Sequence, residues 1–394
     1  MAASTERDEA RELGLSLVRG DLAFRLQRAI GLVPAHGLGV GRRALALALF
    51  TWLPIAVWAT WTGRAVAGVG EPLLQHFGVS VRCLVAIPLF VIAEAGAHAT
   101  TMRLLPYFER SGLVAEADRG RFAAIVRSVA RLRDKTQPWI AFVVLIAAWT
   151  LAFPTEAGNH EVLWAEEGAT HRLGFGGFWF VYVARPLYLL LALAWLWRIA
   201  LMTLLLARIS RLPLAIVPTH PDGAGGLGFL SAVPRIFAPV VLGASAVAAA
   251  RWAHEVVYHG LDAMSLRLPM VGFVVMMLVV VFVPLLVFLP KLMAARRTAL
   301  LDYGALVGRH GDLVRRRWIA GEPVEDDAVL GAPELGPVAD TLALYGAVRS
   351  MRPLPFDRGA VVAIGAAAVL PMLVVLALQV PLKELLLKVL KVLA

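Results

Sequence analysis

Seven apolar segments constrain this 394-residue chain more than any other feature of its sequence. A bilayer core holds no water for backbone N–H and C=O groups, so a segment that crosses it must satisfy them internally, as a helix does. About 20 mostly apolar residues make one crossing. The chain is 59% hydrophobic and 17% charged, against about 45–50% and about 25% in soluble domains. The sequence therefore predicts an all-α polytopic transmembrane helix bundle of about seven spans, at residues 44–61, 81–104, 139–154, 174–209, 235–258, 268–290 and 359–381.

The fourth apolar segment, 174–209, is too long for one simple crossing. It contains Arg185-Pro186, and proline disfavours helical geometry in the residue before it. We therefore expect a kink at this point, with an interfacial piece at 174–184 and the membrane span itself at 187–209.

The positions of Lys and Arg set the expected orientation. Seven lie before residue 44, eight in the 103–135 loop and ten in 291–358, whereas the 62–80 and 155–172 loops hold one each. Basic loops remain in the cytoplasm, which predicts a cytoplasmic N-terminus, with anionic lipids as partners at that face. Because the net charge of +10 is distributed over alternate loops and forms no groove-tracking patch, no nucleic-acid partner is expected.

The same pattern divides the chain into five parts. The 291–358 part should form two helices, 291–319 continuing out of the sixth span and 338–350, which gate the protein or join subunits of a homo-oligomer. Asp21 is a good N-cap for an amphipathic helix at 22–32. The expected parts are a cytoplasmic amphipathic N-terminal segment (1–43), six spans (44–290), a cytoplasmic helical hairpin (291–358), the last span (359–381) and an amphipathic tail (382–394).

Ionisable side chains inside the predicted spans are the best functional lead, because a charge at the bilayer centre costs about 2.5–3.5 kcal/mol even on the most lenient scale. Glu94 and His98 share one face of the second span, and Arg198 lies at a similar depth in the fourth. The sequence predicts a Glu94–Arg198 ion pair. The pair either locks helix packing or moves with a substrate or proton.

A second group lies toward the outer end of the fifth span. Arg251, His254 and Glu255 have i, i+3, i+4 spacing and should face one side of the helix. Arg251 and Glu255 either pair within the helix or line a conducting vestibule with His254. The run from His254 to His259 resembles a zincin motif, but its histidines are five residues apart where the zinc site needs four.

The most unusual loop precedes the fifth span and contains His220, Asp222, Gly223, Gly225 and Gly226. Its glycines could expose backbone N–H groups to an anion at a helix start, and His220 with Asp222 could contribute to a metal site. The alternative is a tight connection in which Asp222 accepts hydrogen bonds from turn amides and Ser231 caps the next helix.

The glycine-rich loop, the Arg-rich hairpin and the terminal stretch PLKELLLK together resemble uncharacterised multi-pass inner-membrane proteins of bacteria. The resemblance implies the membrane class and location, and it implies no activity because that family has none assigned.

Three functions remain open. The leading hypothesis is a channel or proton-coupled carrier in which Glu94, His98, Arg198, Arg251 and Glu255 line a polar route. The second is a membrane-embedded metal-dependent hydrolase that uses some of His220, Asp222, His254, Glu255 and His259. The third is a non-catalytic sensor or scaffold in which every buried charge is paired. No cofactor is expected, and no metal-ligand set is assigned.

Overall fold

The computed structural model describes residues 15–34, 37–66, 72–152, 161–167, 172–323 and 336–379. In this part of the chain seven helices are long and apolar enough to cross a membrane, one for each predicted span. The prediction of an all-α membrane bundle is confirmed. The predicted amphipathic tail, 382–394, lies outside the described residues.

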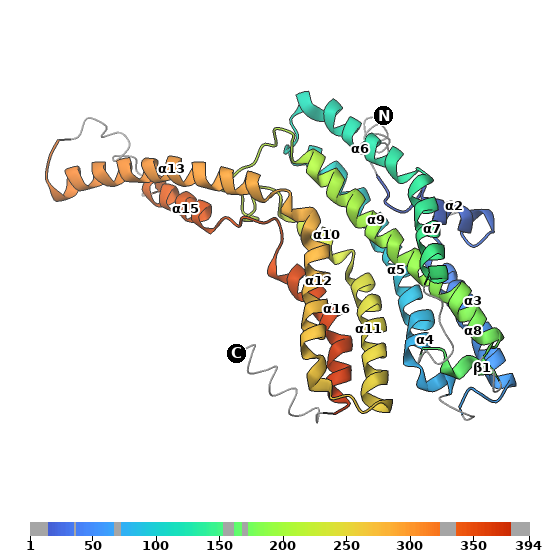
Figure 1. The fold of residues 1–394 in the computed structure, drawn as a ribbon. Helices are drawn as coiled ribbons and strands as arrows, with labels where there is room; N and C mark the ends of the chain where they lie inside the picture. Colours follow the sequence, from blue (N-terminus) through green and yellow to red (C-terminus); the bar gives the residue numbers. More distant parts are fainter. Residues whose placement is uncertain are drawn as a thin grey trace.

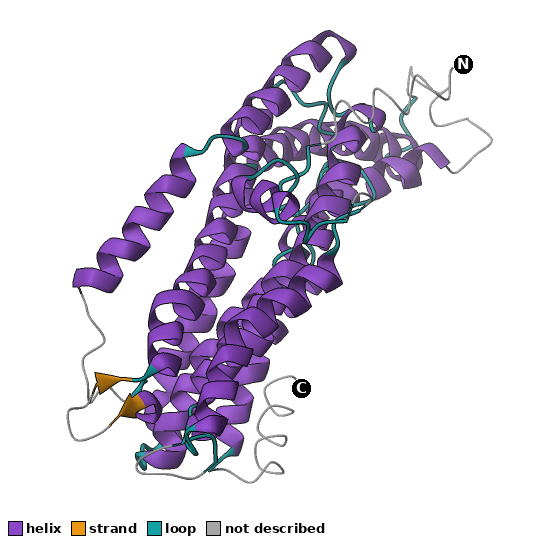
Figure 2. Cartoon of the chain, turned by 90° about the vertical axis from the view of Figure 1, so that its right-hand side faces the viewer, coloured by secondary structure: helices purple, strands orange, loops and turns teal. Residues whose placement is uncertain are grey.

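Among the described residues the helical elements follow one another with one short hairpin of strands (Figure 2). In chain order they are α2 (Leu22–Ala29), α3 (Val40–Trp61), η1 (Leu73–Gln75), α4 (Phe77–Val81), η2 (Arg82–Ala86), α5 (Ile87–Arg110), η3 (Glu116–Asp118), α6 (Arg119–Arg133), α7 (Gln137–Ala152), η4 (Leu163–Ala165), β1 (Glu166–Glu167), β2 (Arg172–Leu173), α8 (Phe175–Trp179), η5 (Phe180–Ala184), α9 (Arg185–Ile209), η6 (Gly228–Ser231), α10 (Ala232–Arg235), α11 (Ala238–Tyr258), η7 (Ala263–Leu266), α12 (Arg267–Leu286), α13 (Leu289–Val314), η8 (Arg315–Ile319), α15 (Gly336–Ser350) and α16 (Arg358–Ala377).

The long helices form one bundle, in which α11 packs along α16, α3 along α5, and α9 against α6 and α12 (Figure 1). One end of the bundle carries the N-terminal segment (15–34), α6 and α13, and we call it the basic end because the Arg-rich segments gather there. The opposite end, which we call the far end, carries η1, the β1–β2 hairpin and the turn between α11 and η7.

Two π-helical stretches interrupt the spans, and each ends immediately before an X-Pro pair. The N–H of Ile87, which precedes Pro88, bonds to the carbonyl of Arg82, and the N–H of Arg185, which precedes Pro186, bonds to that of Phe180. A proline ring clashes with the carbonyl four residues earlier, and a wider π turn relieves that clash. The expected interfacial piece at 174–184 is not a separate helix, because α8, η5 and α9 form one continuous helix from Phe175 to Ile209, and the second π turn ends at the position of the expected kink.

The helical hairpin of the basic end is formed by α13 and α15, which pack against each other. Arg296 on α13 donates to the carbonyl of Arg349 on α15 at 2.8 Å. The expectation that α13 simply continues the sixth span is wrong: α12 ends at Leu286, and α13 begins at Leu289 and leaves the bundle sideways (Figure 1).

Candidate functional site: a buried charge network and a far-end cavity

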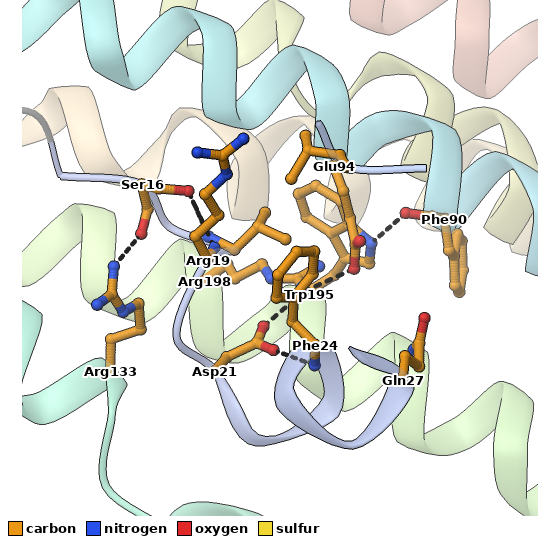
Figure 3. A network of polar contacts seen from close by, with 12 residues as sticks. Ser16, Arg19, Asp21, Phe24, Gln27, Phe90, Glu94, Arg133, Trp195 and Arg198 are labelled. Carbon is orange, nitrogen blue, oxygen red and sulfur yellow. Dashed lines mark hydrogen bonds and ion pairs between the residues drawn. The ribbon is translucent and has the colours of Figure 1, made fainter. Parts of the chain in front are cut away.

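Four charged side chains meet inside the bundle and are almost completely buried. Glu94 on α5 is at the centre: its Oε1 lies 2.7 Å from Nη2 of Arg198 on α9, and its Oε2 lies 2.6 Å from Nη2 of Arg43 on α3. The same Nη2 of Arg198 lies 2.7 Å from Oδ2 of Asp21 (Figure 3). We call Asp21, Arg43, Glu94 and Arg198 the buried quartet. It joins three spans and the N-terminal segment.

Aromatic and amide groups hold both guanidinium groups of the quartet. Arg198 lies 4.7 Å from the ring of Trp195, one helical turn earlier, and the indole N–H of Trp195 donates to the carbonyl of Phe90 at 3.0 Å. Arg43 lies 5.2 Å from the ring of Phe24, and its Nε donates to the side chain of Gln27 at 2.5 Å. Ring faces attract cations, so these contacts compensate part of the lost hydration.

The quartet includes the predicted Glu94–Arg198 pair, but sequence reasoning missed Asp21 and Arg43. Asp21 was identified only as an N-cap, and the cap is present: Oδ1 accepts from the N–H of Phe24 at 2.7 Å while Oδ2 faces Arg198. Arg43 was assigned to the basic N-terminal segment, although its helix begins earlier, at Val40, and its side chain is buried. One signal could have identified Arg43: the carboxylate of Glu94 has two oxygens and can therefore pair with a second basic side chain besides Arg198.

The quartet is electrically neutral, with two carboxylates and two guanidinium groups. Buried ion pairs gain little net free energy because desolvation opposes the attraction, but loss of one partner leaves a stranded charge. His98, one turn after Glu94, is half-buried and makes no hydrogen bond through Nδ1 to any described residue. His98 is therefore not hydrogen-bonded to the quartet through this nitrogen.

A cavity of about 630 Å³ lies among α11, α12, α9 and η2, toward the far end. We call it the far-end cavity. Charged and polar groups face it beside an apolar wall, and its lining consists of Arg82, Glu161, Tyr188, Ala244, Val247, Ala248, Arg251, Trp252, Glu255, Phe273 and Met277.

Arg82 and Glu161 form the fixed charges of this cavity, and sequence reasoning identified neither. Nη2 of Arg82 lies 2.8 Å from Oε1 of Glu161, and Arg185 approaches the other oxygen at 3.9 Å. The rings of Phe180 and Tyr188 flank the Arg82 guanidinium at 5.2 and 5.5 Å. Burial alone would raise the pKa of Glu161, but the guanidinium groups outweigh it and hold that pKa below its ordinary value.

Arg251 and Glu255 line the cavity without pairing. The structure has no ion pair between them, nor between either of them and another described residue. Of the two alternatives left open for this group, the Arg251–Glu255 pair within the helix is therefore not formed. Arg251 precedes Glu255, which is the less favourable order for an i, i+4 pair on a helix.

His254 does not line the far-end cavity with Arg251 and Glu255. Its ring stacks on His76 at 4.8 Å, and its Nδ1 lies 3.1 Å from the carbonyl of Gln75. The ring of His259, just after the end of α11, lies 5.3 Å from that of His254. Even so, no group of three His, Cys, Asp or Glu among the described residues is arranged to hold a metal ion.

A layer of aromatic rings separates the far-end cavity from the buried quartet. Phe90 on α5 lies in the sequence between Arg82 of η2 and Glu94, and it stacks on Tyr188 at 5.6 Å. Trp195 meets Phe237 edge to face at 5.8 Å. We call Phe90, Tyr188, Trp195 and Phe237 the aromatic layer. Three of the four rings are at most 1% exposed, so side chains are closely packed at this level of the bundle.

The glycine-rich loop at the basic end is an ordered connection built around Asp222. Its carboxylate accepts from the N–H groups of Ala224 at 2.8 Å, Gly226 at 3.2 Å and Gly228 at 2.7 Å. These amides are the ones that an external anion would use, so Asp222 itself occupies the proposed anion site. His220 Nδ1 lies 3.0 Å from Asp222 Oδ1, so the two residues contact each other within the turn.

Ser231 does not act as the predicted cap. It precedes α10 in helical geometry and makes no side-chain capping hydrogen bond. Asp222 performs that function, because Gly228, whose N–H it accepts, is the first residue of η6.

These features define a multi-pass α-helical membrane protein with a buried, paired charge network and a separate charged cavity. Comparison with protein-family models, curated proteins and solved structures finds no match for this chain. The argument for function therefore rests on the geometry of the quartet and the cavity.

Proposed function

We propose that this protein is a membrane carrier for a small solute, held here with its substrate cavity open at the far end and closed toward the basic end. We further propose that the basic end faces the cytoplasm of a bacterial inner membrane, as the Lys and Arg distribution favours. The far-end cavity carries the proposal: it places unpaired charges within the spans, and a single aromatic layer separates it from the quartet.

The aromatic layer argues for a carrier over a channel. A channel needs a continuous polar route, whereas Phe90 and Trp195 are buried between the cavity and Glu94. Transport by alternating access requires this layer to open while the cavity closes. Breaking the quartet is the corresponding step at the basic end, because Asp21, Arg43, Glu94 and Arg198 come from four segments that would have to separate there.

The two π-helical stretches support a moving mechanism. The π bulges Arg82–Ala86 and Phe180–Ala184 lie in the two spans that carry three of the four rings of the aromatic layer and the quartet residues Glu94 and Arg198. Such bulges recur at functional sites because the helix is locally wider and has fewer α-type hydrogen bonds.

The two rival functions have less support. A metal-dependent hydrolase needs a ligand cluster, and the described residues provide none. A scaffold in which every charge is paired explains the quartet, but it leaves Arg251 and Glu255 without a role.

Cysteine accessibility tests the carrier without knowledge of its substrate. Cys83 is the only cysteine, so a Cys83→Ala background accepts single reporters. Ala248→Cys reports on the far-end cavity, Ala97→Cys on the level of the quartet, and the exposed Thr298→Cys on the basic end as the sidedness control. Each variant is reacted with a membrane-impermeant maleimide added to one face of the membrane.

A carrier predicts that Ala248→Cys reacts from the far side and that Ala97→Cys reacts, more slowly, from the basic side. A channel would make both cysteines reactive from the same side. A static scaffold would leave Ala97→Cys protected from both faces, and that result would overturn the proposal.

A further inference from the structure

We infer that the far-end cavity binds a small zwitterion, with Arg251 holding its anionic group, Glu255 its ammonium group, and an apolar body lying against Trp252, Phe273 and Met277. This inference deepens the proposed function, since it names the substrate class of the carrier. Binding of a zwitterion in this cavity can be tested whether or not the protein transports it.

The size and walls of the cavity suit a small organic molecule. Its volume of about 630 Å³ falls within the range of small-molecule sites, about 300–1,000 Å³. Trp252 and Phe273 meet edge to face at 6.2 Å, and Met277 continues the same wall one turn along α12. A bare inorganic ion would leave this apolar wall without a partner.

Two opposite charges face the cavity at a spacing that fits a zwitterion. Arg251 and Glu255 are one turn apart on α11, where Cβ atoms are separated by about 5–6 Å. Neither forms an ion pair with a described residue, although the charge of Arg251 also acts on Glu161 in the same cavity, so the guanidinium and the carboxylate both keep hydrogen-bonding positions for a ligand. Guanidinium groups recognise carboxylate or phosphate, and carboxylates recognise ammonium groups.

The other charges of the cavity argue against singly charged ligands. Arg82 pairs with Glu161 at 2.8 Å and is flanked by two rings, so its guanidinium is held in place as part of the cavity wall. A ligand with only an anionic group would lie against the carboxylate of Glu255, and one with only an ammonium group would lie against Arg251. Like charges brought together in this way oppose binding, whereas a zwitterion satisfies both groups.

The ligand could be a free amino acid with an apolar side chain or a lipid with a zwitterionic head group, since both combine the same chemistry. The test therefore has two arms. In the first, the purified protein in detergent is titrated with L-phenylalanine, with 3-phenylpropanoate, which lacks the ammonium group, and with 2-phenylethylamine, which lacks the carboxylate. In the second, it is placed in nanodiscs of phosphatidylethanolamine or of phosphatidylglycerol and its thermal stability is measured.

Binding of a free zwitterion predicts that L-phenylalanine binds at least about tenfold more tightly than either analogue, as expected for one charge-assisted hydrogen bond. Glu255→Gln should remove the preference over 3-phenylpropanoate, and Arg251→Gln the preference over 2-phenylethylamine. Arg267→Gln is the matched control, because Arg267 is an exposed far-end arginine outside the cavity, and it should change nothing.

A head-group ligand predicts instead that phosphatidylethanolamine stabilises the wild type more than phosphatidylglycerol does, and that Glu255→Gln abolishes this difference. Ala248→Trp, which fills the cavity without changing a charge, should block either ligand and provides a second test if a charge variant does not fold. The inference is overturned if neither zwitterion is preferred over its singly charged counterpart. Selective binding of L-phenylalanine without flux into proteoliposomes would support the site and overturn the carrier.

Discussion

Asp21 and Arg198 lie 177 positions apart in the sequence, and their side chains meet inside the bundle at 2.7 Å. Asp21 belongs to the segment before the first span, whereas Arg198 lies well inside the fourth. The contact ties the N-terminal segment into the core, where Leu17, Val18 and Phe24 are also buried. This segment is thus part of the packed core at the basic end.

Asp21→Ala should loosen the N-terminal segment more than Asp21→Asn. Both changes remove the charge that faces Arg198, but asparagine can still accept from the N–H of Phe24 as an N-cap, and loss of a cap costs about 1 kcal/mol. Limited trypsin digestion of the purified protein should cleave after Arg19 or Arg25 fastest in Asp21→Ala, more slowly in Asp21→Asn and slowest in the wild type. Equal rates in all three would show that Asp21 does not anchor the segment.

Glu94→Gln and Arg198→Gln should each destabilise the protein by about 3–5 kcal/mol, because each strands buried charges of the quartet. The double variant removes one charge of each sign and should cost clearly less than the sum of the two single changes. Unfolding in a detergent titration measures the four free energies of the cycle. The exposed pair Arg119 and Glu116, changed to glutamine in the same way, is the control and should show almost no coupling.

Gly225→Val should sharply reduce the yield of folded protein. Gly225 has φ +65°, and an added Cβ would lie 2.4 Å from Cγ2 of Ile216, so both backbone and packing oppose the change. Gly226, with φ +93° and Leu113 3.2 Å from an added Cβ, should respond in the same direction. Gly223→Asn is the matched control: its φ of +62° is one that asparagine tolerates, and the nearest atom is 3.6 Å away. Normal yield and melting temperature for Gly225→Val would identify the loop as a flexible linker.

The stabilisation provided by Asp222 should depend on pH in a defined direction. Burial alone would raise the pKa of its carboxyl, but hydrogen bonds from Ala224, Gly228 and Gly226 outweigh it and hold the pKa below its ordinary value of 3.8. The folded state therefore favours the ionised form, so the contribution is complete above about pH 4 and is lost as the pH falls further. Because His220 contacts the same carboxylate, the comparison is made in a His220→Gln background, where the difference in melting temperature between the protein with Asp222 and Asp222→Asn should be constant from neutral pH to about pH 5 and shrink below about pH 4. A difference that grows on acidification would contradict this assignment.

Reporter fusions test the proposed orientation. Fusions after residues 70, 120, 165 and 320 should report outside, inside, outside and inside, because the spans between them alternate and the basic loops remain in the cytoplasm. The fusion at 320 is decisive, since it follows the Arg315–Arg317 run. An external signal there would reverse the membrane orientation and place the far-end cavity in the cytoplasm.

Hydropathy and local chemistry determined the class of this protein from its sequence. A spanning helix satisfies its own backbone, so each apolar run predicts one element without knowledge of its neighbours, and all seven are present. Local capping was also predictable, because Asp21 and Asp222 bond to amides within six residues of themselves. The Glu94–Arg198 pair was also predictable, because burying either charge without a partner costs free energy and the two residues lie at a similar depth.

Only the tertiary structure decided which charges meet and which remain apart. Pairing across helices depends on their rotation and packing, which sequence spacing does not specify, so Arg43 and Asp21 were missed as partners of the quartet. Conversely, Arg251 and Glu255 have the spacing of an ion pair but face a cavity whose walls come from other helices. Glu161, in a loop between the third and fourth spans, meets Arg82 of the second span and Arg185 of the fourth. Local sequence specifies each helix and its caps, whereas the convergence of distant side chains is a property of how the helices pack.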